Sequence, residues 1–232
     1  MSKFYVVATP IGNMGDITFR AIETLKSVDL ILCEDTRQTK KILDKYDIKK
    51  PTMSYHAQSK LSKVDKIFEL LEEGRNLALV SDAGTPGISD PGALLVSQIK
   101  EYFNPARGVL AGKTVEVIPI PGATALITAL SACGLPIHEF TFLGFFPHKK
   151  GRETLFKEIK DAKRTFVFYE SPHRILKTLE SLVKFCPDKR VCVARELTKI
   201  YEEFKIGTPA EVLEYFQKNK EKQRGEFVVI VA

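Results

Sequence analysis

The chain has 232 residues, of which 44% are hydrophobic and 28% are charged. This composition is ordinary for a soluble globular protein and excludes a disordered or fibrous chain. No apolar run approaches the ~18–20 residues that span a bilayer, and the excess of 35 basic over 29 acidic side chains, a net charge of +6, is compatible with a polyanionic partner.

The first half of the chain alternates short apolar runs with segments of helical apolar spacing, which is typical of a parallel α/β sheet. Helical spacing is clearest in the segment from Leu61 to Leu71, and a small apolar helix is predicted from Ala123 to about Cys133. Strands are predicted at Phe4–Ala8, Asp29–Cys33, Thr52–Tyr55, Leu77–Val80 and Thr114–Pro119. We expect two α/β domains, an N-terminal one over residues 1–119 and a C-terminal one over residues 120–232.

The second half continues with further apolar runs and two helix-start signals. Ser171 and Pro172 suit the N-cap and first turn of a helix. The run Thr208-Pro-Ala-Glu211 is a capping box with proline at the first helical position. Strands are predicted at Phe140–Phe146, Arg164–Tyr169, Arg190–Ala194 and Glu226–Val231.

The loop after the strand at Leu77–Val80 is the strongest candidate for a ligand site. It contains three glycines, two prolines and the two carboxylates of Asp82 and Asp90. Ligands of open α/β sheets bind at the carboxyl ends of the strands, where such loops lie. The alternative is a well-made turn, since the same residue types favour turns. Asp90 precedes Pro91-Gly92 at the start of the next helix, where capping explains it.

Several common kinds of site lack sequence support. No phosphate-binding glycine motif and no nucleophile elbow occur in the chain. The histidines are scattered without metal-ligand spacing, so no metal site is predicted. The cysteines are far apart and mostly in apolar segments, so we expect reduced thiols in the core rather than disulfides. They are Cys33, Cys133, Cys186 and Cys192.

The loops at the strand ends resemble the tetrapyrrole methylase superfamily of S-adenosylmethionine-dependent methyltransferases. Within it, they are similar to the branch that 2′-O-methylates a decoding-site cytidine of 16S ribosomal RNA. The matching runs cover nearly the whole chain in the expected order. They are Ala8-Thr-Pro-Ile-Gly-Asn13, Asp16-Ile-Thr18, Cys33-Glu-Asp-Thr-Arg37, Ser81-Asp-Ala-Gly-Thr-Pro-Gly-Ile-Ser-Asp-Pro-Gly92, Pro121-Gly-Ala-Thr-Ala125, Phe145-Phe-Pro147, Tyr169-Glu-Ser-Pro-His-Arg174, Arg195-Glu-Leu-Thr-Lys199 and Gly225-Glu-Phe227.

The resemblance implies two α/β domains with the S-adenosylmethionine site in the inter-domain cleft, usually within a homodimer. Backbone amides and a carboxylate suit the zwitterionic end of this donor, and apolar side chains suit its adenine. From the N-terminal domain the implied donor-binding residues are Pro10, Ile11, Asp82, Ala83, Gly84, Thr85 and Ile88. From the loop and helix that follow they are Thr124 and Ala125, and from the C-terminal domain Tyr169, Leu197 and Phe227.

The acceptor chemistry leaves several residues open. A ribose hydroxyl is a poor nucleophile at neutral pH, so a nearby base or cation is expected. Glu34 or Glu170 could accept the proton, and Arg37 could hold a phosphate or a carboxylate; Asp35 and His56 are further candidates. RNA docking is expected from basic residues at strand ends of the C-terminal domain. They are Lys149, Lys150, Arg152, His173 and Arg174.

The partner implied by the resemblance is 16S ribosomal RNA in the small ribosomal subunit, and a cytoplasmic location is expected. Longer members of the branch carry a further C-terminal segment, so any RNA contact made there is expected to be missing. Two alternatives stay open. One is a methyltransferase of the same fold that acts on a tetrapyrrole or a protein, and the other is a non-catalytic RNA-binding module.

Overall fold

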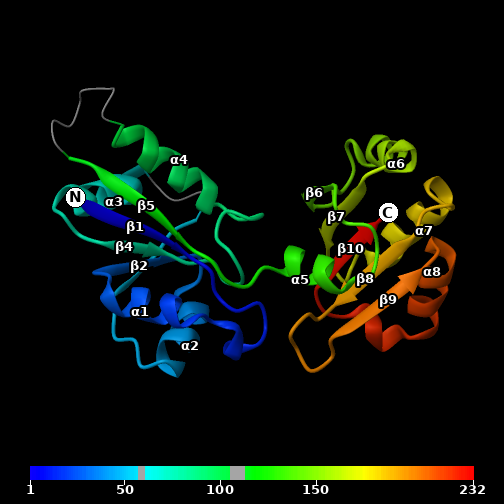
Figure 1. Ribbon diagram of the computed structural model, residues 1–232, viewed down its shortest axis with the longest axis horizontal. Coiled ribbons are helices and arrows are strands. Elements are labelled where there is room, and N and C mark those ends of the chain that lie inside the picture. The colour runs from blue at the N-terminus through cyan, green and yellow to red at the C-terminus, as the bar shows by residue number, and fades with distance from the viewer. Residues whose placement is uncertain (57–60, 105–112) are drawn as a thin grey trace. The chain divides into compact units, whose positions relative to one another are not determined.

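The computed structural model describes residues 1–56, 61–104 and 113–232 (Figure 1). These residues form two compact units, Met1–Thr124 and Ala125–Ala232. The predicted boundary between residues 119 and 120 falls at the last residue of the final strand of the first unit, β5 (Val115–Ile120).

The first unit contains a five-stranded sheet with the order β3-β2-β4-β1-β5, and every pairing in it is parallel. Its other strands are β1 (Ser2–Val7), β2 (Leu30–Cys33), β3 (Thr52–Ser54) and β4 (Leu77–Leu79). Its helices are α1 (Phe19–Ser27), α2 (Thr36–Lys45), α3 (Leu61–Glu72) and α4 (Gly92–Tyr102), with a 3₁₀ turn, η1 (Met14–Asp16). The parallel α/β arrangement predicted for this half is confirmed.

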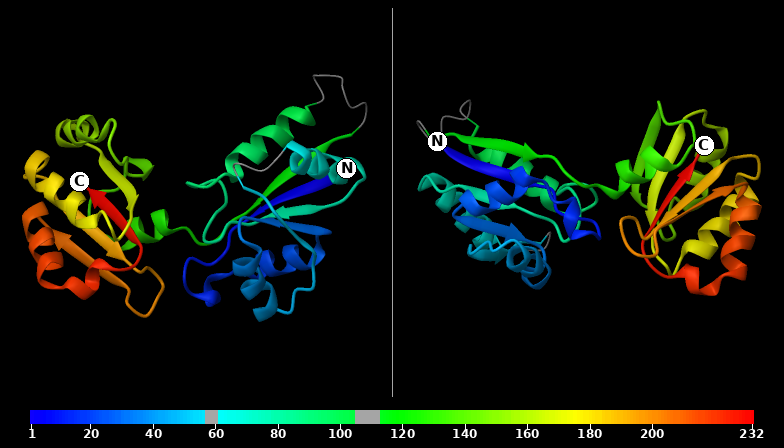
Figure 2. Two further views of the ribbon diagram at one scale, coloured as in Figure 1. Left: turned by 180° about the vertical axis from the view of Figure 1, so that it is seen from behind. Right: turned by 60° about the horizontal axis from the view of Figure 1, so that its bottom comes forward.

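Helices cover both faces of this sheet, with α1 and α2 on one side and α3 and α4 on the other (Figure 2). Leu25 of α1 belongs to an apolar cluster with Ile31 of β2. Ile67 of α3 and Ile99 of α4 belong to a second cluster with Phe4 of β1. Because both faces are covered, the central strands β2 and β4 are continuous apolar runs, and polar residues follow where they end.

The second unit contains a mixed five-stranded sheet with the order β6-β7-β10-β8-β9. The pair β6 and β7 is parallel, whereas β10 is antiparallel to both of its neighbours and β8 is antiparallel to β9. Its strands are β6 (Phe140–Phe145), β7 (Thr165–Glu170), β8 (Val191–Arg195), β9 (Glu203–Gly207) and β10 (Phe227–Val231). Its helices are α5 (Ala125–Ala132), α6 (Arg152–Asp161), α7 (Ile175–Phe185) and α8 (Pro209–Lys218), with a 3₁₀ turn, η3 (Lys220–Gln223).

Two predicted helix starts have different outcomes. The capping box at Thr208 is confirmed, because the Thr208 amide donates to the Glu211 carboxylate at 2.8 Å and the Glu211 amide donates to the Thr208 hydroxyl at 3.3 Å. The start predicted at Ser171 is wrong, because α7 begins at Ile175. The Ser171 carbonyl instead accepts from the amides of Arg174 and Ile175, which makes a turn that leads into the helix.

All four cysteines are buried, as expected of core thiols. In the described part of the chain, no helix is both long and apolar enough to cross a membrane.

Candidate functional site

The loop after β4 is attached to the loop after β1 by a short antiparallel bridge between Thr9 and Gly84. The Thr9 amide donates to the Gly84 carbonyl at 2.9 Å, and the Gly84 amide donates to the Thr9 carbonyl at 3.1 Å. The buried Thr9 hydroxyl also donates to the Ser81 carbonyl at 3.1 Å. Sequence analysis predicted both loops but not this pairing, because backbone partners leave no signal in the sequence.

Glycine is required at the bridge. Gly84 has a φ of +84°, and a Cβ atom there would lie 3.3 Å from Cγ2 of Ile11. Further along, the Asp90 carboxylate accepts from the amides of Gly87 and Gly92, each at 2.7 Å. Gly92 is the first residue of α4 and Pro91 is its N-cap, so Asp90 lies one residue before the N-cap and binds the first amide of the helix. These contacts fix the loop from Gly84 to Gly92, and Asp82 and Ala83, which lie between Ser81 and Gly84, are exposed.

The exposed carboxylate of Asp82 joins two strand ends. The amide of Asp35, which follows β2, donates to Asp82 at 3.0 Å. Asp35 in turn forms two side-chain hydrogen bonds with Arg37, at 3.1 Å and 2.7 Å, and also accepts the Arg37 amide as the N-cap of α2. The hydrogen bonds from Arg37 lower the pKa of Asp35 to about 2, so this carboxylate is ionised at neutral pH.

The pKa of Glu34 is shifted in the opposite direction to that of Asp35. Partial burial raises the pKa of its carboxyl group, and the nearby negative charges of Asp90 and Asp82 raise it further. A carboxylate with a raised pKa is a better proton acceptor than an ordinary one. Among the described residues, no group of three His, Cys, Asp or Glu side chains is arranged to hold a metal ion, so these carboxylates do not form a recognisable metal centre.

The other predicted donor-binding residues of the first unit lie around the same loop. Pro10 and Ile11 are buried beside the bridge, and Ile88 is exposed within the loop. The Thr85 hydroxyl donates to the Ala123 carbonyl at 3.1 Å, which attaches the loop to the segment that contains Thr124. The structure therefore brings the loops after β1, β4 and β5 together. Ala125 is the first residue of α5, in the second unit.

The predicted donor-binding residues of the second unit gather at one end of its sheet. Phe227 is buried and pairs with Glu170 on β7 and with Arg195 on β8. Tyr169 precedes Glu170 and packs edge-on against Phe142 and Phe145, with ring centroids 5.0 and 5.5 Å apart.

Leu197 lies in a loop whose backbone is held in an unusual conformation. Its neighbours Glu196 and Thr198 have φ values of +50° and +65°, which non-glycine residues rarely adopt. The Glu196 carboxylate accepts from the Glu226 amide and from Lys199, both at 2.9 Å. A Cβ atom at Gly225 would lie 2.6 Å from Cγ of Glu196, so glycine is needed where the two loops meet. Strained backbone that its surroundings hold in place is typical of functional loops.

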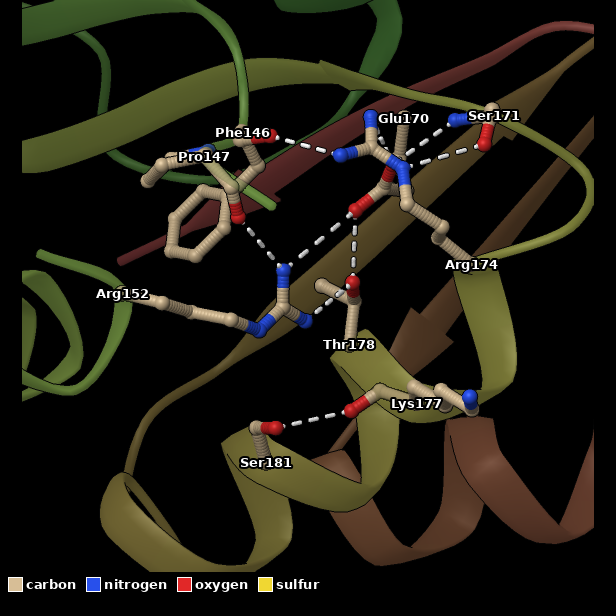
Figure 3. A network of polar contacts seen from close by, with 9 residues as sticks. All are labelled: Phe146, Pro147, Arg152, Glu170, Ser171, Arg174, Lys177, Thr178 and Ser181. Carbon is tan, nitrogen blue, oxygen red and sulfur yellow. Dashed lines mark hydrogen bonds and ion pairs between the residues drawn. The ribbon is translucent and has the colours of Figure 1, made fainter. Parts of the chain in front are cut away.

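Glu170, one of the two candidate bases, is at the centre of a buried polar network in the second unit (Figure 3). The residue is 2% exposed. Its carboxylate accepts from the Ser171 amide at 2.8 Å and from the Thr178 hydroxyl at 2.6 Å. It also forms an ion pair with Arg174 at 2.7 Å. These partners occupy both oxygens of the carboxylate, so the arrangement has the character of a structural ion pair.

Two of the predicted RNA-binding arginines belong to this network. The side chains of Arg152 and Arg174 are each 15% exposed. Arg174 donates to the Phe146 carbonyl at 2.8 Å, and Arg152 donates to the Pro147 carbonyl at 3.1 Å and to the Thr178 hydroxyl at 2.8 Å. Burial lowers the pKa of Arg152, while the charge of Glu170 opposes that shift. Both guanidinium groups therefore fix the start of the loop that follows β6.

The remaining basic residues predicted to bind RNA are on the surface. Lys149 and Lys150 lie in the loop between Pro147 and α6, and His173 lies in the turn before α7. All three are exposed. Sequence analysis grouped them with the two arginines because all five follow strands, and only the structure separates the partly buried pair from the exposed three.

Comparison with known proteins agrees with the resemblance of the loops. The family model described as Tetrapyrrole (Corrin/Porphyrin) Methylases matches residues 3–213. A protein of Halalkalibacterium halodurans named Ribosomal RNA small subunit methyltransferase I is 49% identical, over 98% of this chain and 74% of its own length. Proteins of the same name from Bacillus subtilis and Thermotoga maritima are 47% and 42% identical over all of this chain, and over 75% and 99% of their own lengths.

Solved structures share the fold at much lower identity. The uroporphyrin-III-C-methyltransferase of Thermus thermophilus aligns with a TM-score of 0.64 and 18% identity, over 99% of this chain and 94% of that protein. The methyltransferase CobJ aligns with a TM-score of 0.66 and 20% identity, over 100% of this chain and 92% of that protein.

Proposed function

This chain belongs to the tetrapyrrole methylase family, and from that premise we propose that it is an S-adenosylmethionine-dependent methyltransferase of 16S ribosomal RNA. The finer proposal is 2′-O-methylation of a cytidine ribose in the decoding region. The observation that carries the proposal is similarity of 42–49% identity, over nearly the whole chain, to relatives named for methylation of small-subunit ribosomal RNA.

The loops of the first unit fit the methyl donor. Asp82 offers an exposed carboxylate for the ammonium group of the donor, and the Thr9–Gly84 bridge keeps Asp82 and Ala83 in place. A residue larger than glycine at position 84 would place its Cβ atom 3.3 Å from Ile11 and fill the space beside the loop. When bound, S-adenosylmethionine supplies a methyl group on a sulfonium that is already electrophilic. The chain then has to hold an acceptor oxygen in line with that methyl group, and orientation alone can contribute ~7–11 kcal/mol.

We propose Glu34 as the group that accepts the proton of the acceptor hydroxyl. Its pKa is raised by partial burial and by Asp90 and Asp82, which makes the carboxylate more basic. Glu170 is less suited, because two arginines and two hydrogen-bond donors already occupy its carboxylate. Arg37 would then act on a phosphate or on Asp35, with which it forms hydrogen bonds.

We propose that Lys149, Lys150 and His173 bind the phosphate backbone of the RNA, since each is exposed. Arg152 and Arg174 would position the loop that contains Lys149 and Lys150, because they donate to the carbonyls at its start. The contributions of Tyr169, Leu197 and Phe227 to donor binding, the homodimer and the cytoplasmic location stay predictions.

A second candidate function is methylation of a tetrapyrrole, which the structural similarity to the uroporphyrin-III-C-methyltransferase favours. At 18% identity this likeness concerns the fold, so ribosomal RNA is the preferred substrate class. Incubation with tritiated donor and either small ribosomal subunits or uroporphyrinogen separates the two. Label in RNA supports the first function, and label in the tetrapyrrole supports the second. A folded chain that binds no donor in calorimetry would contradict both and favour the non-catalytic alternative.

A further inference from the structure

The first unit contains a basic pocket of which the proposed function uses only Arg37. It has a volume of about 480 Å³ and lies between α2 and the segment that leads into β3. Four cationic side chains line it, namely Arg37, Lys40, Lys49 and Lys50, against the single carboxylate of Asp44. Such an excess of positive charge in a concave surface raises the local concentration of anions.

The lysines of this pocket are available to a ligand. In the described part of the chain, the side-chain ammonium groups of Lys40 and Lys50 have no hydrogen bond or ion pair. Lys49 lies 3.2 Å from Asp47, but both side chains are at least 80% exposed. Exposed pairs of this kind contribute little to stability, and water or an incoming anion replaces them at small cost.

The size and shape of the pocket favour a nucleotide unit over a single inorganic ion. Its volume lies within the ~300–1,000 Å³ of ordinary ligand pockets. The basic residues are spread over a helix and the chain that follows it, so they match a row of phosphates rather than one isolated charge. The nearly buried side chain of Leu43 forms part of the pocket floor.

The pocket is connected to the candidate methyl-transfer site through a short chain of contacts. Arg37 lines the pocket and holds the carboxylate of Asp35 at 2.7 Å. The amide of Asp35 donates to Asp82 at 3.0 Å. A strand of RNA that occupies the pocket would thus pass directly beside the carboxyl ends of β2 and β4.

We propose that this pocket binds the phosphodiester backbone of the RNA substrate, next to the nucleotide that is methylated. The inference rests on the proposed function for the identity of the RNA. The chemistry of recognition is independent of sequence, because cations that contact phosphates position a strand without reading its bases. The pocket would therefore bind an unrelated single-stranded RNA as well.

The test replaces Lys40, Lys49 and Lys50 by alanine in the full chain. The matched control replaces Lys26, Lys66 and Lys100, exposed lysines on α1, α3 and α4 of the same unit, so that the net charge changes equally. The Kd for 16S ribosomal RNA and for an unrelated single-stranded RNA is measured at several salt concentrations. Calorimetry with S-adenosylmethionine checks in both variants that the donor site is intact.

We expect the pocket variant to bind both RNAs roughly tenfold or more weakly, and the slope of log Kd against log salt to fall by about 2, at ~0.7 per phosphate contact. The control should lose much less, and donor affinity should be unchanged in both variants. Equal losses in the two variants, or no binding of unrelated RNA by the unmodified chain, would overturn the proposal. Failure of the proposed function looks different, because the chain would then bind RNA through the pocket without transferring a methyl group to it.

Discussion

The amide of Asp35 lies 3.0 Å from the carboxylate of Asp82, so a single hydrogen bond joins the loop after β2 to the loop after β4. Arg37 holds the other side of Asp35. The candidate base Glu34 precedes Asp35 in the chain, so this bond joins its loop to the candidate donor loop within the first unit. Substitutions at the residues around this bond can be tested for their separate effects on donor affinity and on the stability of the fold.

Asp82→Asn removes the charge of Asp82 but keeps an oxygen that can accept the Asp35 amide. Hydrogen bonds to charged groups contribute ~1.5–3 kcal/mol, so we expect the Kd for S-adenosylmethionine to rise ~10–150-fold. The melting temperature should stay close to that of the unmodified chain. Calorimetry and thermal unfolding measure the two effects, with Asp65→Asn on α3 as the exposed control. Unchanged donor affinity would remove Asp82 from the site.

Glu34→Gln should stabilise the chain at neutral pH. The pKa of Glu34 is raised in the folded state, so the folded state binds more protons than the unfolded state between the two pKa values. The free energy of unfolding contributed by Glu34 therefore falls as the pH rises from the unfolded pKa through the folded one. Because glutamine does not titrate, the variant should gain stability relative to the native chain above that window and not below it.

Denaturant titrations of both chains at low and neutral pH measure the gain from Glu34→Gln. If Glu34 also accepts the proton in catalysis, the same variant loses methyl transfer at saturating donor while it gains stability. A variant that is less stable at neutral pH would contradict the electrostatic account of Glu34.

Gly84→Ala tests the bridge to Thr9. A left-handed backbone conformation costs an alanine ~1–2 kcal/mol, and the added Cβ would lie 3.3 Å from Ile11. Gly74→Ala is the matched control, because Gly74 has a φ of +89° with nothing within 4 Å of the added atom. We expect both variants to lose the unfolding free energy of the shared backbone cost, with a larger loss in Gly84→Ala because of the contact with Ile11, and weaker donor binding only in Gly84→Ala. Equal donor affinity in both would show that the bridge does not shape the donor loop.

Glu170→Gln should lower the stability of the chain by ~3–5 kcal/mol, because it removes the buried counter-charge of two partly buried guanidinium groups. Glu180→Gln, an exposed position on α7, is the control and should be near neutral. Urea unfolding measures the loss. The folded fraction of the Glu170 variant should retain methyl transfer to within about tenfold; a loss of ~100-fold or more would instead support a role as general base.

Much of the fold follows from local patterns in the sequence. The buried parallel strands of the first unit are continuous apolar runs, such as Leu77–Leu79, and glycine and proline mark the loop that follows. Strand β9 was not predicted, because Glu203 and Lys205 alternate with only two apolar residues at the edge of the sheet. Helix α6 was not predicted either, because it is mostly charged and buries only Phe156 and Ile159.

For the candidate site, the sequence predicts which loops contribute but not which contacts each side chain makes. Glu170 and Glu34 both follow or end an apolar strand, and their patterns are alike. The difference comes from distant residues, since Arg152 and Arg174 reach Glu170, whereas Asp82 and Asp90 lie near Glu34. The lysines of the pocket beside α2 can be seen as a basic cluster in the sequence. The pocket itself forms only because the segment between α2 and β3 folds back beside the helix.

The most direct test of the central claim is methyl transfer with analysis of the product nucleoside. The chain is incubated with tritiated S-adenosylmethionine and small ribosomal subunits that lack the methyl group, and the purified 16S ribosomal RNA is digested to nucleosides. We expect the label in 2′-O-methylcytidine, and its amount should fall sharply with Asp82→Asn. Label in a base-methylated nucleoside, or none in RNA from a chain that binds the donor, would contradict the account.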